Sequence, residues 1–255
     1  MIKIVSTKGN AIMFRQLRRT TAVTCLCSLV AVLAWSATAP AATIIGNPVL
    51  LSTLTVPNGT IVVGDKTFTN FTYNFTGDMP PSTVVNVIPI TDDSGNFGIR
   101  FQGAFIDTTG VAGGSDALIT YTVTAGAGRL ISDAHLQGNP SLLGTQGSIS
   151  VTETFLPLNQ VPPYQMTIYA DQNLGTKMVD QTAFTPIKSL NVQKDILALA
   201  KLPSGTGPPQ TVTMSFVDQT FSQVPEASTL MLSLIGCVGL GLKRRRQAAS
   251  FGSAA

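Results

Sequence analysis

The chain has 255 residues, of which 44% are hydrophobic and only 11% are charged, so it is long enough for one large all-β domain or two small domains and too apolar for charge-rich disorder. The formal net charge of +3 arises at the ends, because nine of the sixteen basic residues lie there and twelve of the thirteen acidic residues lie between Thr43 and Val224. A mildly acidic central part excludes the basic surface that nucleic-acid binding requires.

The central part also contains few residues suited to metal binding or catalysis. All three cysteines, Cys25, Cys27 and Cys237, lie in the apolar end segments, which excludes disulfides and Cys-ligated metal sites from the centre. The centre has one histidine, His135, and no tryptophan. We therefore expect no metal, no cofactor and no enzymatic activity.

The first 41 residues have the layout of a secretory signal peptide. Arginines at positions 15, 18 and 19 precede an uncharged run, Thr20 to Trp35, which is short for a membrane span and is followed by small residues. Signal peptidase could cleave after Ala39 or Ala41. We expect Ala41, because cleavage after Ala39 would leave Pro40 at the new N-terminus. Counted from Met1 the basic region is unusually long, so Met13 is an alternative start.

Residues 42–223 read as strands. Apolar residues alternate with Thr, Ser or Asn, which places them on one face of a strand, in four segments: 71–75, 119–123, 149–151 and 212–216. Further strands are expected at 49–56, 83–88, 97–101, 166–169 and 189–199. Around ten short strands separated by Gly, Pro, Asn and Asp clusters predict an all-β, antiparallel β-sandwich or jelly-roll-like ectodomain.

One stretch, Ser189 to Lys201, is ambiguous. Leu190, Lys194 and Leu197 nearly follow the 3.6-residue period of a helix. Neither end carries a convincing cap, so the sequence favours a pair of strands over a helix. The Pro- and Gly-rich segment that follows, 201–209, reads as a loop.

Candidate chemistry is sparse. The segment 92–96 gathers Asp, Ser and Asn oxygens around a glycine, as small calcium loops do, but it lacks the remaining EF-hand spacing, so we expect a hairpin turn. His135 lies near Asp133 and is expected to be a surface or turn histidine. Glu153 is the only glutamate in this part, so a glycosidase pair would need an Asp partner that the sequence does not identify. The four tyrosines and most phenylalanines are expected in the core and not on a sugar-stacking surface.

The C-terminal segment carries the most specific motif. Val224, Pro225, Glu226 and Ala227 precede an apolar run that ends at Leu242, and Lys243, Arg244, Arg245 and Arg246 follow. This arrangement resembles the PEP-CTERM sorting signal of Gram-negative bacteria, in which a Pro-Glu-Pro box precedes one apolar helix and an arginine cluster. The resemblance implies recognition by exosortase, a membrane-embedded cysteine protease. Two departures are Ala227 in place of proline and the tail 247–255.

The physical properties of this segment suit a membrane. The apolar run, 227–242, would be about 24 Å long as a helix, against a hydrocarbon core of ~30 Å. The basic cluster would stay on the cytoplasmic side and leave Pro225 and Glu226 at the outer face. An ordinary C-terminal anchor is the alternative, and both interpretations place the body outside the cytoplasm.

These features predict four parts: a signal peptide (1–41), a β-sandwich ectodomain (42–223), a sorting signal with a transmembrane helix (224–246) and a tail (247–255). Three segments of the expected ectodomain, 130–136, 147–155 and 216–221, are similar in sequence to PEP-CTERM ectodomains that have no assigned activity. The resemblance implies an exported protein, held briefly in the inner membrane and then released to the cell surface or matrix, with a structural or adhesive role in exopolysaccharide or biofilm. The alternative is a carbohydrate-binding module or a polysaccharide hydrolase. An exposed aromatic strip would favour binding, and two carboxyls about 5 to 9.5 Å apart would favour hydrolysis.

Overall fold

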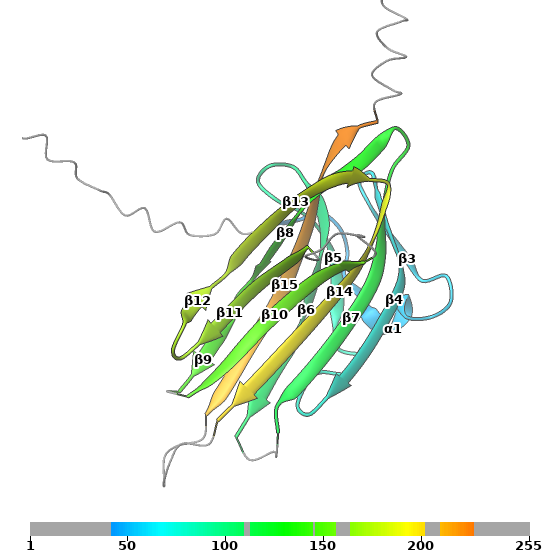
Figure 1. The fold of residues 1–255 in the computed structure, drawn as a ribbon. Coiled ribbons are helices and arrows are strands. Elements are labelled where there is room, and N and C mark those ends of the chain that lie inside the picture. Colours follow the sequence, from blue (N-terminus) through cyan, green and yellow to red (C-terminus); the bar gives the residue numbers. More distant parts are fainter. Residues whose placement is uncertain (1–41, 110–112, 145, 157–163, 202–209, 227–255) are drawn as a thin grey trace, which may run out of the picture. The chain divides into compact units, whose positions relative to one another are not determined.

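The computed structural model describes residues 42–109, 113–144, 146–156, 164–201 and 210–226, which form an all-β domain of two antiparallel sheets (Figure 1). The expected signal peptide, with Ala39 and Ala41, lies outside these residues, as do Ala227, the basic cluster Lys243 to Arg246 and the tail. Within the described ranges, no helix is both long and apolar enough to cross a membrane.

The first sheet, sheet A, has the strand order β1-β5-β6-β15-β8-β13, with β2 paired to β5 and β9 paired to β15. Its strands are β1 (Thr43–Ile44), β2 (Val49–Leu50), β5 (Asn86–Thr91), β6 (Phe97–Thr108), β8 (Arg129–Gly138), β9 (Ser141–Leu143), β13 (Val179–Ile187) and β15 (Thr211–Pro225).

The second sheet, sheet B, has the order β12-β11-β10-β14-β7-β4-β3. Its strands are β3 (Thr60–Val63), β4 (Lys66–Thr76), β7 (Ser115–Ala125), β10 (Gly147–Leu156), β11 (Gln165–Asp171), β12 (Gly175–Lys177) and β14 (Ser189–Ala200), and the one helix in the described part, α1, spans Leu51–Leu54.

Eight strands give the connectivity of a jelly roll. They pair as β6-β15-β8-β13 in sheet A and as β7-β14-β10-β11 in sheet B, so that the chain crosses repeatedly from one sheet to the other. As a result, the last strand, β15, lies in the middle of sheet A between β6 and β8. The expected two-sheet antiparallel architecture is confirmed.

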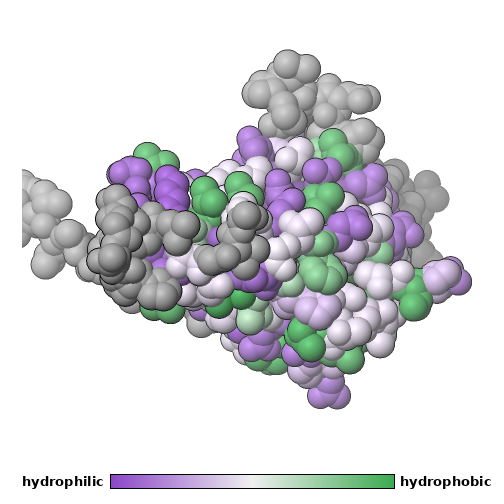
Figure 2. All heavy atoms as spheres, turned by 90° about the horizontal axis from the view of Figure 1, so that it is seen from below, coloured by the Kyte–Doolittle hydropathy of each residue, from purple (hydrophilic) through white to green (hydrophobic). Residues whose placement is uncertain are grey.

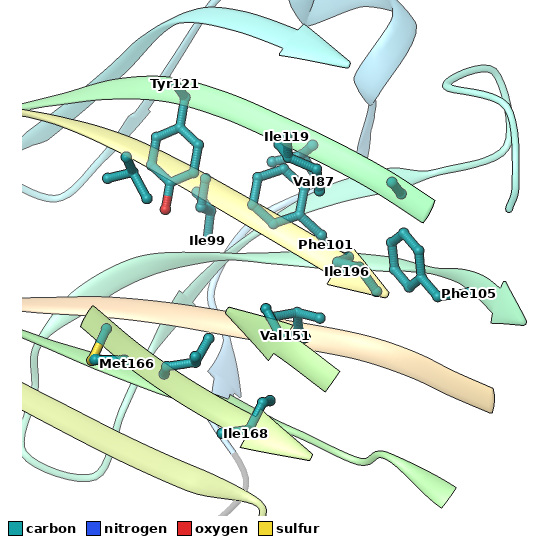
Figure 3. Packing of buried hydrophobic residues seen from close by; sticks show 14 of the residues in the cluster. Val87, Ile99, Phe101, Phe105, Ile119, Tyr121, Val151, Met166, Ile168 and Ile196 are labelled. Carbon is teal, nitrogen blue, oxygen red and sulfur yellow. The ribbon is translucent and has the colours of Figure 1, made fainter. Parts of the chain in front are cut away.

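The core lies between the sheets and follows from the period-2 pattern. Buried and partly exposed residues alternate without interruption along β7 and through most of β10. Figure 3 shows Ile119 and Tyr121 of β7 and Val151 of β10 packed with Ile99 and Phe101 of β6 from the other sheet. Because each strand turns one face inward, Thr, Ser, Asn and Gln are left on the outer faces.

Two strand predictions are wrong in detail. The expected strand at 49–56 is the short β2 followed by α1, because Leu51 and Leu54, three residues apart, both enter the core. The expected strand pair at 189–201 is a single 12-residue strand, β14, paired with β10 on one side and β7 on the other. The helix-like spacing arose because Lys194 occupies an inward position among apolar neighbours while Leu197, 50% exposed, lies on the outer side.

The last strand continues into the motif that resembles a sorting signal. Val224 pairs with Leu130 and Pro225 with Arg129, so β15 passes the expected boundary at residue 223. The Glu226 N–H donates to the Gly128 carbonyl (3.0 Å), and the Lys188 Nζ lies 3.2 Å from Glu226 Oε1. The first three residues of the motif are therefore held against the sandwich.

Candidate functional site

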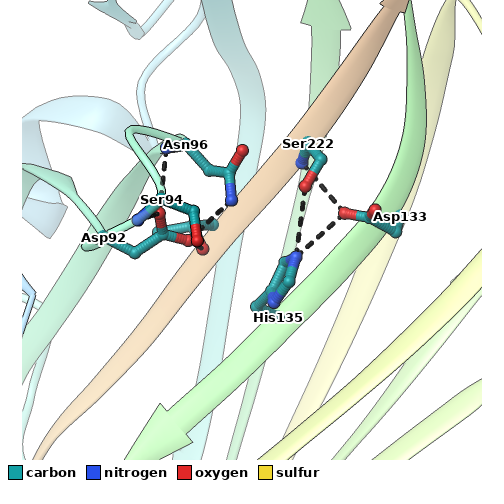
Figure 4. A network of polar contacts seen from close by, with 7 residues as sticks. Asp92, Ser94, Asn96, Asp133, His135 and Ser222 are labelled. Carbon is teal, nitrogen blue, oxygen red and sulfur yellow. Dashed lines mark hydrogen bonds and ion pairs between the residues drawn. The ribbon is translucent and has the colours of Figure 1, made fainter. Parts of the chain in front are cut away.

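The outer side of sheet A carries a groove made of two adjoining hollows of about 150 and about 190 Å³, which share His135. The β5–β6 turn, β8 and β15 line the first hollow, and β8 and β13 line the second. Figure 4 shows the polar side chains around it. We call it the His135 groove.

The β5–β6 turn is the hairpin turn that the sequence predicted. Asp92 Oδ1 accepts the backbone N–H groups of Ser94 and Asn96 (both 2.9 Å), and Asp92 Oδ2 accepts Asn96 Nδ2 (2.9 Å) and Thr220 Oγ1 (2.7 Å). Burial opposes ionisation of Asp92, but these hydrogen bonds outweigh it and lower its pKa. Both oxygens are thus engaged by the protein. Within the described ranges, no three His, Cys, Asp or Glu residues are grouped to hold a metal ion.

His135 lies on strand β8 and not in a turn, with 32% of its side chain exposed. Its Nε2 is 2.9 Å from Asp133 Oδ1 and 3.2 Å from Ser222 Oγ. A Ser-His-Asp triad needs the carboxylate and the hydroxyl on opposite ring nitrogens, whereas here both contact the same nitrogen. Asp133 Oδ1 also accepts the Ser222 N–H (3.1 Å) at an irregularity in the β8–β15 pairing. The trio therefore joins two strands and is not arranged for nucleophilic catalysis.

Asp218, a third carboxylate of the groove, is also engaged. Its two oxygens accept Arg100 Nε (2.6 Å) and Nη2 (2.7 Å). The guanidinium in turn lies 4.2 Å from the centre of the Phe216 ring. Burial raises the pKa of Asp218, and Arg100 opposes that shift. Asp92, Asp133 and Asp218 consequently hold sheet A together and have little capacity left for a ligand, whereas Asp93, which also lines the groove, is exposed.

The outer side of sheet B is different, because its polar side chains form rows across four strands. The rows follow from the strand register: Thr120, Gln193, Thr154 and Gln165 form one row, and Asp195, Thr152 and Thr167 form the next, which Leu118 completes on β7. Leu156 and Leu197, 46% and 50% exposed, lie on the same side of the sheet. We call the following set the polar face: Thr120, Thr122, Ser150, Thr152, Thr154, Gln165, Thr167, Tyr169, Asn191 and Gln193. Two hollows of about 300 and about 310 Å³ lie on it.

Some side chains of the polar face are hydrogen-bonded to one another, and others make no hydrogen bond within the described part of the chain. Near β4, Asn70 Nδ2 donates to Thr122 Oγ1 (3.2 Å), which donates to Asn191 Oδ1 (2.8 Å). Toward β10 and β11, the side chains of Ser150, Thr152, Thr154, Gln165, Thr167 and Gln193 make no hydrogen bond with other residues of the described part. These groups are available to a ligand from outside.

A pair of carboxyls lies beside these rows. Asp195 of β14 pairs in register with Leu118, and Asp116 of β7 with Leu197, which makes the two aspartates diagonal neighbours. Burial, together with a hydrogen bond to Asp116 and repulsion by it, raises the pKa of Asp195 to about 6. Carboxyls in hydrogen-bonding contact are closer than the ~5 Å at which glycosidase pairs begin. Their interaction therefore favours a protonated Asp195, and the two carboxyls lie too close together for the spacing of glycoside hydrolysis.

The aromatic residues do not form a stacking strip in the described part of the chain. Tyr121 is buried in the core as expected, with Phe68 and Phe71 against it, whereas Tyr73, Tyr164 and Tyr169 are partly exposed. Phe75 is 45% exposed and stacks on Tyr73 at the end of β4. On the end of the sandwich seen in Figure 2, hydrophobic side chains are interspersed with hydrophilic ones. Tyr169 is the one aromatic residue of the polar face.

Comparison with known proteins gives no family. No family model matches the chain, and no curated protein matches it. Among solved structures, the chain is similar to the carbohydrate-binding module TmCBM61, solved with β-1,4-galactotriose, with 10% identity, a TM-score of 0.25 and coverage of 60% of this chain and 88% of that one. It is also similar to the enzymatically active domain of tailspike protein 4 of bacteriophage CBA120, with 12% identity, a TM-score of 0.24 and coverage of 60% and 19%.

Proposed function

We propose that this chain is an exported, non-enzymatic protein of the cell surface or extracellular matrix that contacts extracellular polysaccharide through the polar face. The observation that carries the proposal is the set of hydroxyl and amide side chains on β10, β11 and β14 that make no hydrogen bond within the described part of the chain. Sugar hydroxyls both donate and accept hydrogen bonds, and Thr, Ser and Gln side chains do the same. A regular array on a sheet therefore matches a regular polymer.

The physical properties of the face indicate weak binding at each sugar unit. Strands hold these side chains in place, so binding orders little of the protein. Each exchanged hydrogen bond is worth only about 0.5–1.5 kcal/mol net, and the face offers just Tyr169 for stacking. A single site would bind with a dissociation constant on the order of 1 mM. Binding would become effective when many copies of the protein attach to one polysaccharide molecule. This suits a structural or adhesive role.

Export and sorting belong to the same proposal and rest on the terminal sequences. Signal peptidase would remove residues 1–41 after Ala41. The segment from Val224 to Arg246 would then hold the precursor in the inner membrane until an exosortase cleaves near Pro225 and Glu226. A polysaccharide hydrolase is the weaker candidate, because Asp116 and Asp195 interact at a separation shorter than that of a glycosidase pair and His135 has no triad geometry.

Affinity electrophoresis through gels containing the extracellular polysaccharide of the host tests this function. The double variant Thr152→Val/Thr154→Val removes two hydroxyls from the polar face and keeps the size and β-propensity of the side chains. Its matched control, Thr182→Val/Thr185→Val, makes the same change on β13 of sheet A. We expect the gel to retard the native protein and the control but not the polar-face variant. Equal retardation of both variants would refute binding through this face.

A further inference from the structure

Three polar side chains are enclosed between the two sheets. Glu153 of β10, Lys194 of β14 and Gln219 of β15 are each 0% exposed. Glu153 and Lys194 are direct cross-strand partners in sheet B, while Gln219 projects from the inner side of sheet A. Lys194 Nζ donates to Glu153 Oε2 and to Gln219 Oε1, the latter at 3.1 Å. An amine, a carboxyl and a carboxamide therefore meet in the core.

The inward neighbours of this cluster along its strands are apolar, while Asp218 also interacts electrostatically with Lys194, and Tyr121 with Glu153. On each strand, the inward neighbours two residues away are buried hydrophobic residues: Val151 and Phe155, Val192 and Ile196, and Val217 and Phe221. Burial raises the pKa of Glu153 and, although Glu153 opposes the shift, lowers the pKa of Lys194. Both shifts favour a neutral amine beside a protonated carboxyl, because a dry interior disfavours separated charges. A neutral amine is nucleophilic.

Two atoms of the cluster are left without partners. Glu153 Oε1 and Gln219 Nε2 are buried and make no hydrogen bond within the described part of the chain. A buried amide nitrogen without an acceptor is costly. It is also the group that would leave if the carboxamide carbon were attacked.

We infer that Lys194 and Gln219 join to form an intramolecular isopeptide bond, with Glu153 as the proton carrier. The neutral form of Nζ attacks Cδ of Gln219 while protonated Glu153 gives its proton to the leaving nitrogen, Nε2. Glu153 then takes a proton from Nζ, the Cδ–Nε2 bond breaks, and one ammonia leaves. One amide bond replaces another, so the reaction needs no oxidant, reductant or co-reactant.

The geometry suits this step. A carbonyl bond is about 1.23 Å long, so Cδ lies within about 4.3 Å of Nζ. Small torsional changes bring the atoms to the roughly 3–3.5 Å of a near-attack arrangement. Exclusion of water prevents hydrolysis of the amide and of the intermediate. The product would join β14 of sheet B covalently to β15 of sheet A.

The chain contains a natural comparison in a second Lys-Gln pair between the same two sheets. Lys66 Nζ of β4 lies 3.2 Å from Gln223 Oε1 of β15, and Lys66 is 1% exposed. Its carboxylate neighbour Asp65, at 3.1 Å, is 27% exposed. Because water reaches Asp65, this pair lacks a buried acid to carry the proton. We expect Lys66 and Gln223 to remain separate.

The test is peptide mapping of the purified full-length chain, denatured and digested with trypsin and a glutamyl endopeptidase. The expected product is a branched peptide that joins 189–201, uncleaved at Lys194, to 202–226, lighter than the sum of the two by one ammonia. Separate linear peptides with Lys194 cleaved and Gln219 unmodified would overturn the inference. A branch between Lys194 and Glu153, with loss of water, would overturn the assignment of Gln219.

Two variants test separately whether the reaction needs the acid of Glu153 and whether it needs the full length of the Gln219 side chain. Glu153→Gln keeps the size of the side chain and removes the acid, so we expect the rate of branch formation, followed by peptide mapping over time after purification, to fall at least about 100-fold. Gln219→Asn keeps the carboxamide but shortens it by one methylene and is expected to give no branch. If circular dichroism shows that Glu153→Gln does not fold, the peptide maps of Gln219→Asn and of the native protein decide the question. A branch in Gln219→Asn, or a Lys66–Gln223 branch in the native protein, would refute the reasoning.

Discussion

Asp195→Asn should stabilise the protein at neutral pH, although it removes a charged surface residue. The pKa of Asp195 is raised to about 6 from an unfolded value of 3.8, by burial and by Asp116 beside it. Between these two values the native state binds more protons than the unfolded state, so the free energy of unfolding falls as pH rises. Asparagine cannot ionise and resembles the protonated acid. It can still donate an N–H to the Asp116 carboxylate.

The size of the effect follows from the shift. A rise from 3.8 to about 6 corresponds to about 3 kcal/mol at 1.36 kcal/mol per unit. Because Asp195 is an exposed residue on the outer side of β14, solvent screening reduces the expected gain to about 1 kcal/mol. The gain should be complete above pH 7 and vanish below about pH 3, where Asp195 is protonated in both states.

Urea unfolding followed by circular dichroism at pH 3 and pH 8 measures the difference. Asp93→Asn serves as the control, because Asp93 lies exposed in the β5–β6 turn. We expect the control to change stability by under about 0.5 kcal/mol at both pH values. Equal stability of Asp195→Asn and the native protein at pH 8, or a gain that persists undiminished at pH 3, would refute the raised pKa of Asp195.

Two further predictions concern β15. Gly98→Ala should cost about 3 kcal/mol in urea unfolding, because its Cβ would lie 1.9 Å from the Gln219 carbonyl oxygen; native-like stability would contradict the close β6–β15 contact. Arg100→Leu should cost about 3–5 kcal/mol at pH 7, because it leaves Asp218, 2% exposed, without its counter-ion. That cost should shrink at acidic pH, where Asp218 is protonated, and a pH-independent cost would indicate lost packing instead.

The sequence predicted those parts of the fold that depend on local alternation. The segments 119–123, 149–151 and 212–216 lie in β7, β10 and β15 because each alternates strictly between apolar and polar residues. The same rule failed at β14, where the stem of Lys194 occupies a core position and made the spacing look helical. Periodicity cannot distinguish a buried lysine from a surface one.

The candidate sites were less accessible to sequence reasoning, because they depend on register. Glu153 stood out as a lone glutamate, but its partner Lys194 lies 41 residues further on, and only the β10–β14 pairing brings them together. The threonines suggested strands, whereas the rows of the polar face and the contact between Asp116 and Asp195 require the alignment of β7, β14, β10 and β11. Long-range pairing fixes that alignment, and no short segment encodes it.

Threonine methyl NMR of residues 42–226, titrated with the host extracellular polysaccharide, tests the central claim most directly. If the polar face binds the polymer, the methyl signals of Thr120, Thr152, Thr154 and Thr167 should shift together, while Thr182 and Thr185 on sheet A stay unchanged. Shifts confined to Thr182, Thr185 and Thr220 around the His135 groove, or no shifts at a saturating polymer concentration, would contradict the claim.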